Sequence, residues 1–167
     1  MKIQKENRLK IALIIAVILL VIDQITKIIA IQLDVNVTII KDIFNLKLVF
    51  NNGIAFGMGQ GGDIATFIVS NLIVLGIIIR FIILQKDRMD TATMYGLFMI
   101  LSGGFGNVID RVFRGKVVDF IQAFPNMNFP VFNLADVYIV IGWVILAFTF
   151  AMYTYKEIQE KRARSIK

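Results

Sequence analysis

The feature that most constrains this chain is a set of four long apolar windows, at about residues 11–33, 64–85, 92–112 and 134–155. A bilayer hydrocarbon core of about 30 Å requires roughly 20 predominantly apolar residues in each helical span. The composition agrees, because 57% of the 167 residues are hydrophobic and the mean hydropathy is +0.76, which is unusual for a soluble domain. We therefore predict an α-helical membrane protein whose four transmembrane helices form a single domain over residues 1–167.

The segments between the windows predict the topology. Residues 34–63 and 113–133 form long loops, whereas residues 86–91 form a short connection. Lys and Arg are concentrated in the two terminal tails and in the short connection, which the positive-inside rule places in the cytoplasm. Both long loops are then extracytoplasmic and both termini cytoplasmic. Because the net charge of +6 comes from tails rather than from a shaped basic patch, we do not expect binding to nucleic acid.

The two outer loops predict a small β platform. In the first loop, alternate residues are apolar: Phe44, Leu46, Leu48 and Phe50. A period of two is typical of a strand with one buried face. In the second loop, residues 115–122 read GKVVDFIQ and also predict a short strand. Further along, Pro130 and Asn133 predict that the last helix begins at about residue 133.

Ionisable and amide residues gather at one depth of the predicted bundle. They come from four segments and lie near the outer ends of the helices or between them: Asp23, Gln24, Lys27, Asn107, Asp110, Arg111, Asp119, Asn133 and Asp136. An ionisable group at bilayer depth costs on the order of 2.5–3.5 kcal/mol by insertion scales, so such residues are usually paired or functional. The convergence of four segments therefore indicates a functional site beneath the outer loops.

Several of these residues also have a purely structural interpretation. Asp23 and Lys27 are spaced i, i+4 and could simply neutralise one another on one helix face. Arg111 could extend to the membrane interface, or it could keep the neighbouring Asp110 ionised. Asn133 could serve only as the N-cap of the last helix. The pattern alone leaves these alternatives open.

Asp119 and Asp136 fit a structural interpretation least well. No Lys or Arg lies one helical turn from Asp136, and apolar residues flank Asp119. Two carboxyl groups that meet in a low-dielectric site tend to share one proton. The ionised partner can then take a proton from water while the protonated partner donates to a carbonyl oxygen. This chemistry suits amide hydrolysis without an acyl-enzyme, and it needs no metal, no cofactor and neither His nor Cys, both of which the chain lacks.

Five short stretches carry a resemblance to a known family: DQITK at 23–27, NNGIAFG at 51–57, GNVIDR at 106–111, VVDF at 117–120 and FNLAD at 132–136. In this order they resemble the lipoprotein signal peptidases (signal peptidase II), bacterial aspartic peptidases of the cytoplasmic membrane. The resemblance spans essentially the whole chain and implies that Asp119 and Asp136 are the catalytic dyad. It also implies a set of residues that support the site: Asp23, Lys27, Asn51, Gly53, Asn107, Arg111 and Asn133.

The resemblance further implies the substrate, a prolipoprotein that carries a diacylglyceryl group on the cysteine after the cleavage point. We expect a multi-pass, monomeric protein of the bacterial cytoplasmic membrane, in contact with membrane lipids and with its active site near the outer leaflet. Two positions depart from the family pattern. Ile54 stands where Ala is usual, and Val137 stands where a small hydroxyl residue is common. Both concern the shape of the pocket rather than the reaction.

Two other functions would also use intramembrane acids. A proton- or ion-coupled transporter is expected to show discontinuous helices or inverted repeats near the midplane, and the sequence shows neither. A metal-dependent lipid-modifying enzyme could use four aspartates as oxygen ligands: Asp23, Asp110, Asp119 and Asp136. That alternative predicts a loss of activity in chelator, whereas the aspartate dyad does not.

Overall fold

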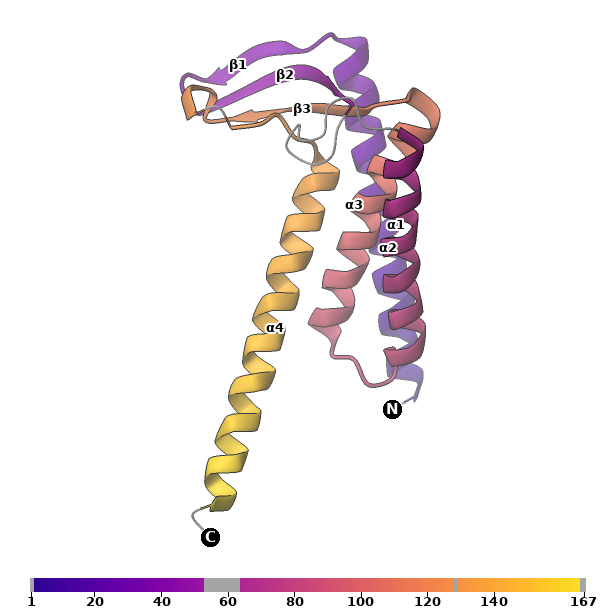
Figure 1. The fold of residues 1–167 in the computed structure, drawn as a ribbon, viewed down its shortest axis with the longest axis vertical. Coiled ribbons are helices and arrows are strands. Elements are labelled where there is room, and N and C mark those ends of the chain that lie inside the picture. The colour runs from indigo at the N-terminus through magenta and orange to yellow at the C-terminus, as the bar shows by residue number, and fades with distance from the viewer. Residues whose placement is uncertain (1, 53–63, 128, 166–167) are drawn as a thin grey trace.

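Four long helices run up and down through the computed structural model, which describes residues 2–52, 64–127 and 129–165 (Figure 1). The helices are α1 (Lys2–Gln32), α2 (Ile64–Gln85), α3 (Thr91–Arg114) and α4 (Leu134–Ser165). Each contains a stretch long and apolar enough to cross a membrane, which confirms the predicted fold class. Gly53 and Ile54, two positions of the family pattern, lie outside the described residues.

Helices α1 and α4 extend beyond their apolar windows. α4 has 32 residues, which at 1.5 Å per residue is about 48 Å and exceeds a hydrocarbon core of about 30 Å. The last turns of α4 are rich in Lys, Glu and Arg, from Lys156 to Arg164. These residues are good helix formers, so the helix continues past the apolar residues into its charged end.

The outer surface of the bundle is apolar, as expected where lipid is the solvent. Ile14, Ile77 and Val144 have exposed fractions of 58%, 63% and 62%. Helix α3 is central, because 67% of its membrane span is buried inside the protein, against 17% for each of the other three spans. The polar residues of α3 are therefore shielded from lipid by its neighbours.

Glycines let α3 and α4 approach one another closely. A Cβ added at Gly103 would overlap the carbonyl oxygen of Ala135. One added at Gly142 would lie 2.6 Å from the carbonyl oxygen of Gly96. These positions leave no room for a side chain, so the two helices touch through their backbones. The upper contact, at Ala135, is adjacent to Asp136.

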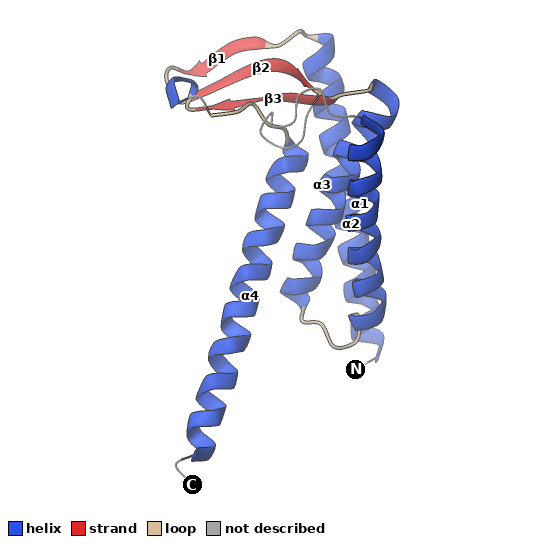
Figure 2. Ribbon diagram, in the orientation of Figure 1, coloured by secondary structure: helices blue, strands red, loops and turns tan. Residues whose placement is uncertain are grey.

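A three-stranded antiparallel sheet covers one end of the helices, and both chain termini lie at the other end (Figure 2). The strands are β1 (Asn36–Ile40), β2 (Phe44–Asn51) and β3 (Val117–Ala123), in the order β1-β2-β3. Apolar residues of β2 and β3 pack with Ala30, near the end of α1. Gly115, with φ of 71°, ends α3 and leads into β3. The predicted β platform is present as this sheet.

An irregularity in β2 changes the face on which its last residues lie. The pairing of β2 with β3 shifts register between Leu46 and Val49. Because side chains alternate with a period of two, one extra residue moves all later residues to the opposite face. Phe50, which strict alternation places on the buried face, is consequently 41% exposed. Asn51 instead shares a face with Val49, whose partner across the sheet is Asp119.

Candidate active site

A cavity of about 190 Å³ lies where the helices meet the sheet. Its polar lining residues come from five elements: Asn51 of β2, Asn71 of α2, Asn107 and Arg111 of α3, Asp119 of β3 and Asp136 of α4. The remaining lining residues are apolar. The cavity thus unites the two predicted catalytic aspartates with three of the residues predicted to support them.

Asp119 is held in the cavity by two amide side chains. Its exposed fraction is 2%, and its two carboxylate oxygens accept hydrogen bonds from the Nδ2 atoms of Asn133 (2.7 Å) and Asn51 (3.0 Å). Burial raises the pKa of Asp119, and the negative charge of Asp136 raises it further, while the two amide hydrogen bonds oppose the increase. The resulting pKa is about 6, compared with an ordinary value of 3.8. Asp119 can therefore gain or lose a proton near neutral pH.

Asp136 is fixed by the start of α4. The backbone N–H of Asp136 donates to Asn133 Oδ1 (3.0 Å), and the backbone N–H of Asn133 donates to Asp136 Oδ2 (3.2 Å). This reciprocal pair is a capping box, with Asn133 as the N-cap and Asp136 three residues later. Asn133 is therefore the N-cap, as one interpretation of the sequence proposed. It also binds Asp119, so a single residue connects the two carboxyl groups.

Asn107 completes the connection between α3 and the two aspartates. Its Nδ2 donates to Asp136 Oδ1 (2.8 Å), and its Oδ1 accepts from Asn133 Nδ2 (3.2 Å). Residues of three elements thus form one chain of hydrogen bonds from Asp119 through Asn133 and Asn107 to Asp136. The orientation of each carboxyl group is set by donors that are themselves held in place.

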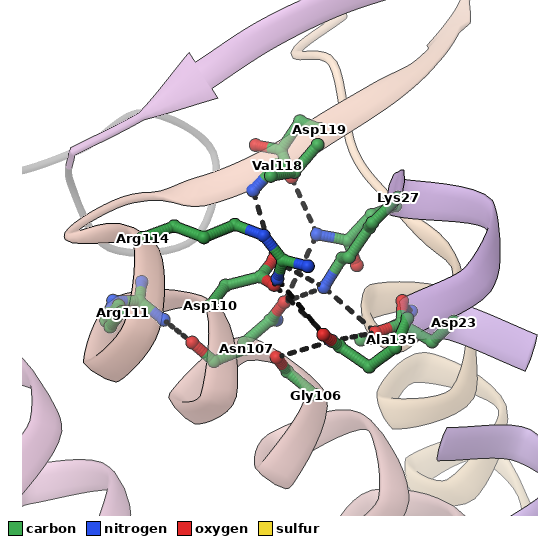
Figure 3. A network of polar contacts seen from close by, with 12 residues as sticks. Asp23, Lys27, Gly106, Asn107, Asp110, Arg111, Arg114, Val118, Asp119 and Ala135 are labelled. Atoms are coloured by element: carbon green, nitrogen blue, oxygen red, sulfur yellow. Dashed lines mark hydrogen bonds and ion pairs between the residues drawn. The ribbon is translucent and has the colours of Figure 1, made fainter. Parts of the chain in front are cut away.

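Beneath Asp119 lies a buried group of charged residues (Figure 3). The Lys27 ammonium lies 3.0 Å from Asp23 Oδ2 and 2.9 Å from Asp110 Oδ2, and all three side chains are fully buried. Asp110 also pairs with Arg114. Asp23 and Lys27 therefore do neutralise one another, as their spacing suggested. They do so within a larger group that also includes α3.

The two arginines at the end of α3 occupy different positions. Arg111 has an exposed fraction of 8%, lines the cavity, and donates from its guanidinium to the Asn107 carbonyl oxygen (3.2 Å). Its charge interacts with Asp136 and Asp119. Arg111 is therefore a residue of the cavity rather than an interfacial anchor. Arg114, one turn above Asp110, takes the place beside that carboxylate.

Sequence reasoning passed over two residues of this region. Asn71, on α2, lines the cavity and donates to the Phe67 carbonyl oxygen (2.7 Å). Asn71 could have been found from the sequence, because it is an amide residue within the strongly apolar window of residues 64–85. Arg114 falls within residues 113–133, the range predicted as the second outer loop. Within the described part of the chain, no three His, Cys, Asp or Glu side chains are grouped so that they could hold a metal ion.

The chain is similar to a family of known proteins. A family model described as signal peptidase (SPase) II matches residues 15–152. The lipoprotein signal peptidase of Halalkalibacterium halodurans is 31% identical, over 90% of this chain and 97% of that protein. Those of Anoxybacillus flavithermus and Maridesulfovibrio salexigens are 34% and 35% identical, over 91% and 90% of this chain and 89% and 98% of their own lengths.

Two solved structures share the fold. Both are of bacterial membrane enzymes and were obtained by the in meso method, at 2.3 and 1.9 Å resolution. Their TM-scores to this structure are 0.79 and 0.74, each at 28% sequence identity. They cover 87% and 84% of this chain, and this chain covers 90% and 92% of them.

Proposed function

Because the chain belongs to the signal peptidase II family, we propose that it is an aspartic endopeptidase that removes the signal peptide from diacylglyceryl-modified prolipoproteins, just before the lipid-modified cysteine. Its family makes it a peptidase, and its four apolar helices make it an integral protein of the bacterial cytoplasmic membrane. The proposal of an aspartic mechanism rests on one observation, that Asp119 and Asp136 line the same cavity.

The proposed reaction is a direct attack of water on the scissile peptide carbonyl. One carboxylate takes a proton from the water while the other carboxyl group donates its proton to the carbonyl oxygen. The tetrahedral intermediate then collapses as the first carboxyl group passes the proton to the departing nitrogen and the second recovers its own. The pKa of about 6 supports Asp119 as a group that changes protonation state near neutral pH.

The neighbouring residues support this chemistry by fixing the geometry. Asn51 and Asn133 hold the carboxylate of Asp119, and Asn107 holds that of Asp136. Arg111 lines the same cavity and presents several donors that can orient a substrate carbonyl. Donors that are already in position need no rearrangement as charge develops in the transition state.

The depth of the cavity suits a lipid-anchored substrate. We place both termini and the short connection in the cytoplasm and the sheet on the outer leaflet, in agreement with the distribution of Lys and Arg. A diacylglyceryl group diffuses in the plane of the membrane, so the peptide bond next to it lies close to the leaflet surface. Water can reach that depth. We propose a monomer as the functional unit, because Asp119, Asp136 and the amide side chains that hold them are bonded to one another within one chain.

The direct experiment is cleavage of a diacylglyceryl-modified prolipoprotein by the purified protein in detergent. Asp119→Asn and Asp136→Asn should each abolish cleavage, because the amide keeps the shape of the side chain but cannot exchange the proton. Asp42→Asn is the matched control, since Asp42 is an exposed residue of the sheet region and contacts Asn126 rather than the cavity. Near-normal turnover in either cavity variant would refute the assignment of Asp119 and Asp136 as the catalytic dyad.

A second arm of the same experiment adds a chelator. The dyad mechanism predicts unchanged cleavage, because protons are exchanged between carboxyl groups and water alone. The metal-dependent alternative predicts a loss that added divalent cation restores. Restorable loss would therefore replace the dyad mechanism with a metal-assisted one.

A further inference from the structure

We propose that Lys27 is a positioning residue that sets the separation of the two aspartates, through a bridge formed with Asp23 and Asp110. The proposal rests on the function proposed above for Asp119 and Asp136. The bridge (Asp23–Lys27–Asp110) joins α1 to α3 by contacts of 3.0 and 2.9 Å, and its three side chains have no exposed surface. None of its members lines the cavity, so it acts through other groups.

Each end of the bridge holds a backbone amide next to one aspartate. Asp110 Oδ2 accepts a hydrogen bond from the N–H of Val118 (3.1 Å), the residue before Asp119. Asp23 Oδ1 accepts one from the N–H of Ala135 (2.9 Å), the residue before Asp136. The two carboxylates therefore fix β3 and the first turn of α4 at matching points. The same ammonium group thus holds both carboxylates that bind Val118 and Ala135, the residues that precede the two aspartates (Figure 3).

The amide at Ala135 is a natural partner for a carboxylate. Ala135 lies in the first turn of α4, where backbone N–H groups have no partner within the helix and the helix dipole favours negative charge. Asp23 supplies that negative charge from a different helix. The start of α4 is therefore fixed to α1 as well as to its own capping box.

Lys27 also helps to fix the orientation of Asn107. The ammonium group has three protons and no acceptor, and it contacts three acceptors: Asp23, Asp110 and, at 3.1 Å, Asn107 Oδ1. Because Lys27 can only donate, the amide oxygen of Asn107 must face it. The amide NH₂ of Asn107 then faces Asp136, to which it donates (2.8 Å). With an apolar residue at position 27, the Asn107 amide oxygen would keep only one of its two donors, Asn133 Nδ2 (3.2 Å), so this orientation would be held less firmly.

The charges of the bridge favour positioning over simple stabilisation. A fully buried ion pair gains little net stability over well-packed apolar residues, because desolvation offsets the attraction. Arg114, with an exposed fraction of 23%, balances the second negative charge of the group. A bridge of this kind defines distances and directions more sharply than apolar packing does. A misplacement of about 1 Å near the reacting groups can cost roughly 10²-fold in rate.

The test compares Lys27→Met with a matched control, Ser102→Ala. Ser102 is also buried and joins α3 to α1, by donating to the Ala16 carbonyl oxygen (3.0 Å), but it has no contact with the bridge. We expect Lys27→Met to lower kcat about 10²-fold with KM within about threefold, and Ser102→Ala to leave both near wild type. Both are assayed on folded protein, well below the thermal transition of each variant.

Amide hydrogen exchange supplies a readout that does not depend on activity. Exchange at Val118 and Ala135 should be about tenfold faster or more in Lys27→Met, and unchanged in Ser102→Ala. If wild type does not cleave prolipoprotein, the proposed function fails while exchange still decides whether the bridge holds these amides. If Lys27→Met does not fold, Asp23→Asn takes its place, because it keeps an acceptor for Ala135 but loses the charge that holds Lys27. We expect it to lose about tenfold in kcat.

Three results would overturn the proposal. The first is an unchanged kcat in folded Lys27→Met, or in Asp23→Asn where that variant replaces it. The second is a loss of kcat without faster exchange at Val118 and Ala135 in Lys27→Met, or without faster exchange at Val118 in Asp23→Asn. The third is an equal loss of kcat in Ser102→Ala, which would mean that any weakening of the α1–α3 contact has the same effect.

Discussion

Asp119→Asn should change the stability of the protein in a manner that depends on pH. The folded pKa of Asp119, about 6, is above its ordinary value of 3.8, so the folded state binds this proton more tightly than the unfolded state does. The stabilisation is fully present below pH 3.8, and it is lost as the pH rises through about 6. The amide in the variant has no such proton to bind. The difference in stability between variant and wild type should therefore grow in favour of the variant between these two pH values.

The size of the change follows from the two pKa values. The difference between 3.8 and about 6 corresponds to about 3 kcal/mol, at roughly 1.4 kcal/mol for each pKa unit. An amide can accept from Asn51 or from Asn133 but not from both, so the variant loses one buried hydrogen bond, worth about 1–3 kcal/mol at every pH. We expect Asp119→Asn to be the less stable protein at pH 4, and equal to wild type or up to about 2 kcal/mol more stable at pH 7.5.

The assay is thermal unfolding of both proteins in the same detergent from pH 4 to pH 7.5. A change of about 3 kcal/mol corresponds to a relative shift in Tm of roughly 6–12 °C for a protein of this size. Carboxyl groups that do not interact with Asp119 titrate alike in both proteins and cancel in the difference. Asp42→Asn controls for removal of a carboxylate outside the cavity. A difference in Tm that stays constant over this range would refute the argument that burial and Asp136 raise the pKa of Asp119.

Three further predictions concern other parts of the molecule. Arg111→Lys should fold normally but lose cleavage by about 10²-fold, because Lys lacks the planar set of donors, and retention of most activity would make Arg111 an anchor only. A cysteine in place of the exposed Asn126 should react with an impermeant thiol reagent from outside the cell, once any outer membrane is made permeable. Reaction only after lysis of the cytoplasmic membrane would reverse the proposed topology. Asp90 is the N-cap of α3, and its carboxylate accepts a hydrogen bond from the Thr93 N–H (2.9 Å). Asp90→Ala should therefore destabilise the protein by about 1 kcal/mol without lowering kcat, and an unchanged Tm would contradict this role.

The helices and the location of the site could be predicted because they depend on properties that the sequence displays directly. A span of apolar residues has few alternatives to a transmembrane helix. Polar residues at matching depths of several spans must then meet one another, since lipid offers them no partner. This reasoning brought Asp119, Asp136 and Asn107 to one region. It did not depend on knowledge of any single contact.

The contacts themselves depend on details that the sequence does not display. The bulge in β2 turns Asn51 toward Asp119, yet alternation from Phe44 onward predicts the opposite face. The partner of Asp110 depends on where α3 ends. Because the helix continues to Arg114, that residue is spaced i, i+4 from Asp110 and pairs with it, whereas an end at about residue 112 leaves Arg114 in a loop.

The backbone contact between α3 and α4 limits how the site can move. Where two helices touch at Gly103 and Gly142, a slide of even part of a turn would bring side chains into the contact. We therefore expect Asn107 and Asp136, which lie on these two helices and are joined by a hydrogen bond of 2.8 Å, to keep a constant separation. Helix α2 meets α3 through side chains such as Leu75, which packs over Gly104 and can change rotamer. If the proposed lipid-anchored substrate enters from the side, α2 is the helix that can give way, while Asn107 and Asp136 stay in place.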